Sequence, residues 1–254
     1  MVTIQQGSEE INSNGGIFLI KKIFEGNESL KMLDAKAKKK QIQDSHIVKA
    51  MIGLFTLGKT HFADISAHYR DELFRDFLVG RIPSEETLRQ RLDDLSGKKW
   101  IQEILDESNV ESLKSYGVFE KERGRSGCYI PLDIDVSPFA NPDCGKEGVE
   151  WTYKQIDGYA PIFAYLGGYE LCAELRPGSQ HSEKGAVKFL ERCAKMIEKL
   201  GIPASMILLR ADSGHDSAEF IAAVRRCGVK KERFSRIQEY TAERWKNKFS
   251  SVEI

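Results

Sequence analysis

The stretch LDIDVSPFAN, residues 132–141, has the apolar character of a central β-strand that ends at Pro138. Asp133 and Asp135 are its two charged residues. Side chains two positions apart on a strand point to the same face of the sheet, so both carboxylates lie on one face. A buried carboxylate without a partner is energetically costly. We therefore expect this strand to lie within a sheet and to carry an acidic site that has partners.

Further segments with strand or helix character follow. The strand-like runs are CYIPLDIDV (128–136), GYAPIFAYLG (158–167), YELCAELRPG (169–178) and MILLRAD (206–212). Helical periodicity covers residues 182–200 and 217–227. Gly167 and Gly168 predict a tight hairpin between the second and third strands. The order β-β-β-α-β-α predicts a mixed sheet covered by helices, not an all-parallel sheet. In this order the first and fourth strands are neighbours, which brings Asp212 toward the first acid pair.

The sequence before residue 117 has a helical period without strand-like alternation. Ser45 and Ser84 are the predicted N-caps of two of its helices, and Ser84 follows Pro83 at a clear start signal. The pattern changes at the basic, glycine-containing segment KERGRSG, residues 121–127. We predict two domains, a helical N-terminal region over residues 1–120 and a sheet-containing core over residues 121–254. The fold class is then α+β or α/β.

Composition limits the partners and the compartment. Lys plus Arg and Asp plus Glu each number 38, so the net charge is zero and gives no whole-chain signal of nucleic-acid binding. The five cysteines are odd in number and scattered without a CxxC pair, which is typical of a reducing compartment and of neither a disulfide framework nor a zinc site. No long apolar run follows the N-terminus, so we predict a cytoplasmic protein that does not enter a membrane.

The carboxylates Asp133, Asp135 and Asp212 are hard oxygen ligands suited to Mg²⁺ or Mn²⁺. Two such ions about 3.5–4 Å apart activate a water and stabilise the leaving oxygen at a phosphodiester. The alternative is that each Asp caps the turn or helix that follows it. Residue types alone leave both interpretations open.

Four blocks together resemble the catalytic core of DDE transposases, which is RNase H-like, and most closely that of the insertion-sequence family thirteen-eighty. The blocks are LDIDVSPFAN (132–141), KEGVEWTYKQIDGYAPIFAYLG (146–167), ELRPGSQHSEKGAVKFL (174–190) and LLRADSGHDSAEF (208–220). The resemblance implies metal-dependent cleavage and strand transfer of DNA at the ends of an insertion sequence. It implies Asp135 as the first catalytic acid, with Asp133 as a close rival, and Asp212 as the second. Asp135 and Asp212 would bind the metal.

The third acid of such enzymes is usually a Glu on a helix further along the chain. The sequence ends at Ile254, before the segment where the resemblance places that Glu. We therefore expect a C-terminally truncated copy whose strand-transfer activity is impaired.

The resemblance also implies DNA as the partner, through the terminal inverted repeats of the element, together with self-association and a bacterial cytoplasm in which bound protein is attached to the nucleoid. Trp151 and Tyr153 are candidates for stacking on a base. The candidates for phosphate contacts are the four residues near the acids and the densest basic cluster of the N-terminal region: Arg176, His181, Arg210, His215, Lys36, Lys38, Lys39 and Lys40.

Two alternatives remain. DIDVS (133–137) also fits the DxDx[ST] opening of haloacid-dehalogenase-type phosphatases, in which Asp133 would be the nucleophile and Asp135 the general acid. Pro138 and the predicted hairpin argue against this, because that motif requires a parallel α/β core. The other alternative is a transposase remnant that binds DNA without cutting it.

Overall fold

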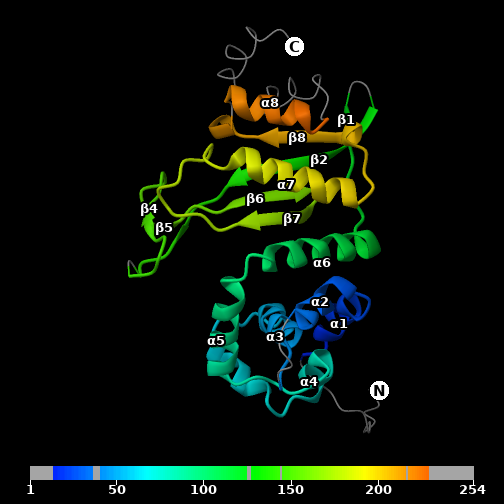
Figure 1. The fold of residues 1–254 in the computed structure, drawn as a ribbon, viewed down its shortest axis with the longest axis vertical. Helices are drawn as coiled ribbons and strands as arrows, with labels where there is room; N and C mark the ends of the chain where they lie inside the picture. Colours follow the sequence, from blue (N-terminus) through cyan, green and yellow to red (C-terminus); the bar gives the residue numbers. More distant parts are fainter. Residues whose placement is uncertain (1–13, 37–40, 125–126, 144, 216, 229–254) are drawn as a thin grey trace, which may run out of the picture. The chain divides into compact units, whose positions relative to one another are not determined.

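The computed structural model describes residues 14–36, 41–124, 127–143, 145–215 and 217–228. The chain divides into two compact units, residues 1–112 and 113–254, and the division falls within helix α6 (Ile101–Tyr116). We call them the helical unit and the sheet unit, and each is described by itself (Figure 1).

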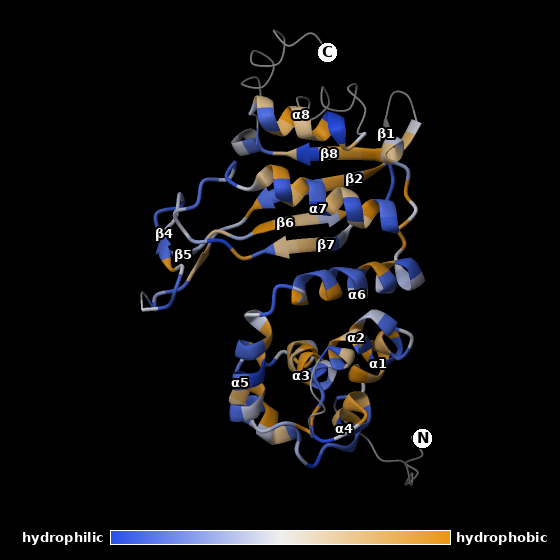
Figure 2. Ribbon diagram, viewed as in Figure 1, coloured by the Kyte–Doolittle hydropathy of each residue, from blue (hydrophilic) through white to orange (hydrophobic). Residues whose placement is uncertain are grey.

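Among its described residues, the helical unit contains five α-helices before α6 and one 3₁₀ helix: α1 (Ile17–Glu25), α2 (Glu28–Ala35), α3 (Asp44–Thr56), η1 (Phe62–His68), α4 (Glu72–Leu78) and α5 (Glu85–Ser96). Its core forms where α3, α4 and α5 meet, and Leu54, Phe74 and Leu88 are fully buried there. Figure 2 shows α3 as largely apolar, as expected of a central helix. Gly53 of α3 lies directly against the rings of Phe74 and Phe77, so this glycine permits close helix packing.

Two helix starts test the capping predictions. Ser84 is the N-cap of α5, and its side chain accepts a hydrogen bond from the Thr87 N–H, which confirms that prediction. The prediction for Ser45 is wrong, because α3 begins at Asp44 and has Gln43 as its N-cap. The Ser45 N–H and hydroxyl instead donate to the carboxylate of Asp34 in α2, at 2.9 and 2.6 Å.

The sheet unit is built on a mixed five-stranded sheet: β1 (Glu122–Gly124), β2 (Gly127–Val136), β6 (Ile162–Leu166), β7 (Tyr169–Glu174) and β8 (Ile207–Ala211). The strand order is β1-β2-β6-β7, and β8 also pairs with β2. β2 is antiparallel to β1 and β6 and parallel to β8. This confirms that the first and fourth predicted strands are neighbours, and the mixture of helices and sheet agrees with an α+β fold.

Helix α7 (Ala186–Lys199) covers one face of the sheet and contacts α8 (Ala218–Arg226) (Figure 1). Phe189, Leu190 and Cys193 form part of its buried side. Leu132 of β2 lines a hollow together with Leu190, so α7 lies on the Leu132 face of the sheet. Because side chains alternate along a strand, Asp133 and Asp135 belong to the opposite face. Two 3₁₀ helices, η2 (Ala204–Met206) and η3 (Ser213–His215), flank β8.

The second predicted strand, residues 158–167, is interrupted in the structure. Its first part is β5 (Asp157–Tyr159), which forms a small separate sheet with β3 (Phe139–Ala140) and β4 (Glu150–Trp151). Pro161 separates β5 from β6, since proline has no N–H to donate to a ladder.

The predicted hairpin between β6 and β7 is confirmed. Gly167 and Gly168 form its turn with φ values of 54° and 91°, a conformation that glycine adopts without strain.

Candidate carboxylate site at the ends of β2 and β8

The parallel pairing of β2 with β8 brings two of the predicted acids side by side. The last paired residues are Ile134 and Ala211, so Asp135 and Asp212 occupy the next position on each strand. Neighbouring residues in a ladder share a face, and the carboxyl ends of parallel strands meet at one edge of a sheet. Figure 1 shows both strands pointing to that edge. Asp135 and Asp212 therefore belong to one site.

Asp133 lies one step earlier on the same face, opposite Arg210 of β8. Its two carboxylate oxygens accept from Nε and Nη2 of Arg210, and the Nη2 bond is 2.5 Å long. Arg210 Nη1 also donates to Glu122 of β1 at 2.6 Å. The hydrogen bond to Asp133 is the main reason that the pKa of Arg210 is raised. Glu122 was missed from the sequence, because its contact with Arg210 spans 88 positions and leaves no local signal.

Asp135 is exposed, and its Oδ2 accepts a hydrogen bond from the Ser137 hydroxyl at 3.1 Å. Tyr153 lies nearby, and its hydroxyl donates to the Val136 carbonyl at 3.0 Å. Burial, and then the negative charges of Asp135 and Asp212, raise the pKa of Tyr153. The Tyr153 phenol is therefore within electrostatic reach of both carboxylates. A role in stacking on a base remains a prediction.

Asp212 is held by the turn that follows β8. Its Oδ1 accepts from the Gly214 N–H at 3.0 Å and from His215 Nδ1 at 2.7 Å. The hydrogen bond from His215 is the main cause that lowers the pKa of Asp212, and the nearby His181 contributes. Asp212 is thus ionised at neutral pH, with 51% of its side chain exposed. Its Oδ2 accepts no hydrogen bond from the described residues, which leaves this oxygen open to a ligand.

His215 is 1% exposed, and its ring packs on Phe220 of α8. Since an ionised carboxylate only accepts, the proton between the two side chains belongs to His215 Nδ1. His215 Nε2 is buried and has no hydrogen-bond partner among the described residues. The burial makes His215 a residue that orients Asp212 rather than one that reaches a phosphate.

The loop from Arg176 to Gly185 reaches the same edge of the sheet. A Cβ on Gly214 would lie 3.0 Å from Ser182 Cβ, so the loop contacts the turn after Asp212. His181 is exposed, and its Nδ1 accepts from the Glu183 N–H at 3.3 Å. Arg176 is only 2% exposed. The structure thus brings Asp133, Asp135, Asp212, His181, Arg210 and His215 together in one region of the sheet unit.

The predicted basic cluster belongs to the helical unit. Lys36 Nζ lies 5.6 Å from the centre of the Trp100 ring, an arrangement suited to a cation–π interaction. Lys38, Lys39 and Lys40 lie outside the described residues.

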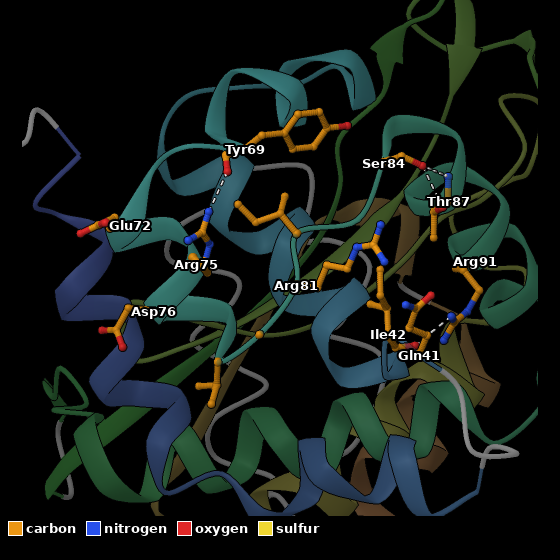
Figure 3. Close-up of a pocket in the computed structure, with 13 residues that line it drawn as sticks. Gln41, Ile42, Tyr69, Glu72, Arg75, Asp76, Arg81, Ser84, Thr87 and Arg91 are labelled. Atoms are coloured by element: carbon orange, nitrogen blue, oxygen red, sulfur yellow. Dashed lines mark hydrogen bonds between the residues drawn. The ribbon is translucent and has the colours of Figure 1, made fainter.

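The helical unit also contains a hollow of about 1280 Å³ that is lined by the segment before α3, by α4, by the α4–α5 connection and by α5, and none of the predicted site residues lines it (Figure 3). Three arginines line the hollow. Arg75 donates to the Tyr69 carbonyl at 3.0 Å, and Arg91 pairs with Asp44. Arg81 is exposed and has no hydrogen bond or ion pair with any described residue.

The donor set of the carboxylate site fits a hard divalent cation. Asp135 and Asp212 both present carboxylate oxygens at an accessible edge, and Mg²⁺ prefers such ligands. Among the described residues, no group of three or more His, Cys, Asp or Glu side chains is placed to hold a metal ion. The described part of the chain therefore contributes two carboxylates, with water or substrate oxygens left to complete a coordination shell.

Comparison with known proteins identifies the family. No curated protein and no solved structure matches the chain. No described helix has the length and the apolar character needed to cross a membrane. The profile of the family "Transposase DDE domain group 1" matches residues 1–231, which is most of the chain. The protein belongs to this family of transposase DDE domains.

Proposed function

We propose that the chain is a DDE-type transposase of the thirteen-eighty type with an RNase H-like core. Its chemistry is metal-dependent DNA cleavage and strand transfer at the ends of an insertion sequence, and its activity is impaired because the described residues supply two carboxylates and no third acid. The observation that supports this most directly is the β2–β8 register, which makes Asp135 and Asp212 neighbours at the carboxyl ends of parallel strands. Such an edge is the usual place for ligand-binding residues in sheets of this kind.

Asp135 and Asp212 are the proposed ligands of Mg²⁺ or Mn²⁺. When bound, the metal supplies a Lewis acid that activates a water or hydroxyl and stabilises the leaving oxygen of a phosphodiester. His215 and the Gly214 N–H hold Oδ1 of Asp212 and keep the carboxylate ionised, so Oδ2 faces the ligand. Ser137 orients the carboxylate of Asp135 in the same way.

Asp133 has a different proposed role. Because Arg210 donates to both of its oxygens, Asp133 ties β2 to β8 and neutralises a charge beside the metal site. The same pair leaves the phosphatase alternative without support, since a nucleophilic Asp needs a free oxygen.

The test is cleavage of a labelled DNA duplex that contains the terminal inverted repeats of the element, with and without Mg²⁺. Asp135→Asn and Asp212→Asn are expected to lower the cleavage rate at least about 100-fold, because each removes a charged ligand of the metal. Glu198→Gln, an exposed change near the end of α7, is the matched control and should cut at the wild-type rate. Metal-independent cleavage, or full activity in both Asn variants, would refute the proposal. Binding without any cleavage would favour the non-catalytic alternative.

We also propose that the helical unit binds the terminal repeats. The support is Arg81, which lines the hollow and has an exposed guanidinium without a protein partner among the described residues (Figure 3). Arg81→Gln should weaken binding of the repeat duplex about 3- to 10-fold. It should also make the slope of the logarithm of the binding constant against the logarithm of the salt concentration shallower by about one unit, as expected for one lost phosphate contact. Arg89→Gln is the control, since Arg89 already pairs with Glu86 and Asp93 of its own helix. Equal binding by the Arg81 variant and the wild type would remove this role.

A further inference from the structure

The N-terminus of α7 presents unused hydrogen-bond donors. The helix follows Gly185, which has a φ of 80° and offers no side chain to cap it, and no acidic residue lies in the first turn. The N–H groups of Val187 and Lys188 have no acceptor among the described residues. Free N–H groups at a helix N-terminus, aligned with the helix dipole, favour an anion.

A buried arginine lies directly behind this helix end. Arg176 is 2% exposed, and the Cζ atom of its guanidinium lies over the Phe189 ring, 5.8 Å from the ring centre. Nε donates to Glu174 at 2.8 Å, and Nη1 donates to the Ser182 carbonyl at 3.4 Å. Nη2 is buried and has no hydrogen-bond partner among the described residues. An unsatisfied charged donor is costly, so this nitrogen requires a partner that the described protein does not supply.

The two features converge at Gly185. A Cβ on Gly185 would lie 3.6 Å from Arg176 Nη2 and 3.9 Å from the Gln180 side-chain nitrogen. Gly185 itself is exposed, and so are Lys184 and Lys188 beside it. Gly185 thus has no side chain to fill the space beside Arg176 Nη2. We call this place the α7 anion site, defined by Arg176, Gln180, Gly185, Val187 and Lys188.

The α7 anion site lies at the same end of the sheet as the carboxylate site, although α7 itself covers the opposite face. Figure 1 shows the N-terminus of α7 at the end of the sheet to which β2 and β8 point. Ser182, three residues before Gly185, contacts the turn after Asp212 at Gly214. The loop that leads into α7 thus contacts the turn that holds Asp212 at this end of the sheet.

We propose that the α7 anion site binds one backbone phosphate of the DNA next to the phosphodiester at Asp135 and Asp212. This proposal rests on the proposed function, and it adds a second contact point for the same substrate. The N–H groups of Val187 and Lys188 donate to the phosphate oxygens, and Arg176 supplies the buried charge behind them. Holding a neighbouring phosphate fixes the register of the strand, so Arg176 is a positioning residue and not a catalytic one.

The decisive variant adds a carboxylate to the site. Gly185→Asp introduces an anion next to Arg176 Nη2 and the helix N-terminus, and Asp tolerates a positive φ better than most residues. It should fold at least as stably as Gly185→Asn, its neutral isostere. Gly185→Asp should also weaken binding of the repeat duplex about tenfold and make the salt dependence of the logarithm of the binding constant shallower by about one unit. Gly185→Asn should weaken binding less and leave the salt dependence unchanged.

Gly201→Asp is the matched control for charge and backbone. Gly201 follows the other end of α7, has a φ of 74° and has open space around it. This variant should bind DNA like the wild type. Equal DNA affinity of Gly185→Asp, Gly185→Asn and wild type would overturn the proposal, even if Asp135→Asn and Asp212→Asn abolish cleavage. If instead Asp135→Asn and Asp212→Asn cleave DNA like the wild type while Gly185→Asp still weakens DNA binding, the proposed chemistry is refuted and the α7 anion site is not.

A titration with inorganic phosphate distinguishes a site for a DNA backbone phosphate from a site for a free anion. Calorimetric titration of the full chain with phosphate should show weak binding that Gly185→Asp removes and Gly201→Asp retains. The proposal requires that the same Gly185→Asp change also weakens DNA binding. Loss of phosphate binding with unchanged DNA affinity would make this a site for a free anion and would overturn the assignment to DNA.

Discussion

Asp133 and Arg210 face each other across the parallel strands β2 and β8, and both carboxylate oxygens of Asp133 are bonded by the guanidinium. Asp135, two residues later, has a single hydrogen bond from Ser137 and lies exposed beside Asp212. Two acids of one strand thus have different surroundings, and this difference supports the proposed division between a structural role for Asp133 and a ligand-binding role for Asp135.

Asp133→Asn should therefore lower the free energy of unfolding by about 1–3 kcal/mol, because it leaves a partly buried Arg210 with a weaker partner. Asp135→Asn should change it by less than about 0.5 kcal/mol, as expected for an exposed side chain. Urea unfolding of the full chain, followed by circular dichroism, measures both. Equal losses of stability for the two variants would contradict this division. Glu122→Gln should show an intermediate loss, because it removes the second carboxylate that pairs with Arg210.

The Asp212–His215 pair predicts a pH dependence of stability. The pKa of Asp212 is lowered in the folded protein, chiefly by the hydrogen bond from His215, so the unfolded chain binds a proton at higher pH than the folded one. The stabilisation is therefore complete above the ordinary value of 3.8 and is lost as the pH falls through the lower folded value. The difference in unfolding free energy between the wild type and Asp212→Asn should therefore shrink as the pH falls below about 4. A difference that grows as the pH falls would have the wrong sign.

The Ser84 cap gives a prediction within the helical unit. Ser84→Ala removes the side chain that accepts from the Thr87 N–H, and it should lower the unfolding free energy by about 0.5–2 kcal/mol. Ser96→Ala, at the other end of α5, removes only a bond to the Asp93 carbonyl and should be close to neutral. Thermal unfolding of both variants tests this, and a neutral Ser84→Ala would show that the cap contributes no stability.

Replacement of Gly167 in the β6–β7 turn by alanine should destabilise the protein more than the same replacement of Gly201. A Cβ on Gly167 would lie 2.9 Å from the backbone nitrogen of Glu120, so Gly167→Ala combines the cost of a positive φ with a backbone collision. Gly201→Ala has a similar φ but open space around it and should cost about 1–2 kcal/mol. Gly167→Ala should cost clearly more than that in the same urea titration. Equal costs would mean that the segment near Glu120 moves away freely.

Local signals in the sequence predicted a large part of this fold. Pro83 and Ser84 marked the start of α5, and Gly167-Gly168 marked the hairpin, because capping and turn preferences act over a few residues. The order of strands and helices predicted that β2 and β8 are neighbours, because connection rules restrict how such elements pair. Ser45 is not the cap because α3 already begins at Asp44, and the Ser45 N–H and hydroxyl donate to Asp34 of α2 instead.

The sequence alone predicted which acids lie near one another, since the alternation along β2 and the position of Asp212 at the end of β8 indicate their face and their end of the sheet. It did not determine which of Asp133 and Asp135 is free to bind a ligand. That choice was made by Arg210, 77 positions away from Asp133, and only the tertiary pairing of the two strands brings that cation to one acid and not to the other. The physical reason is that ion pairing acts over a few ångströms in space, whatever the separation along the chain.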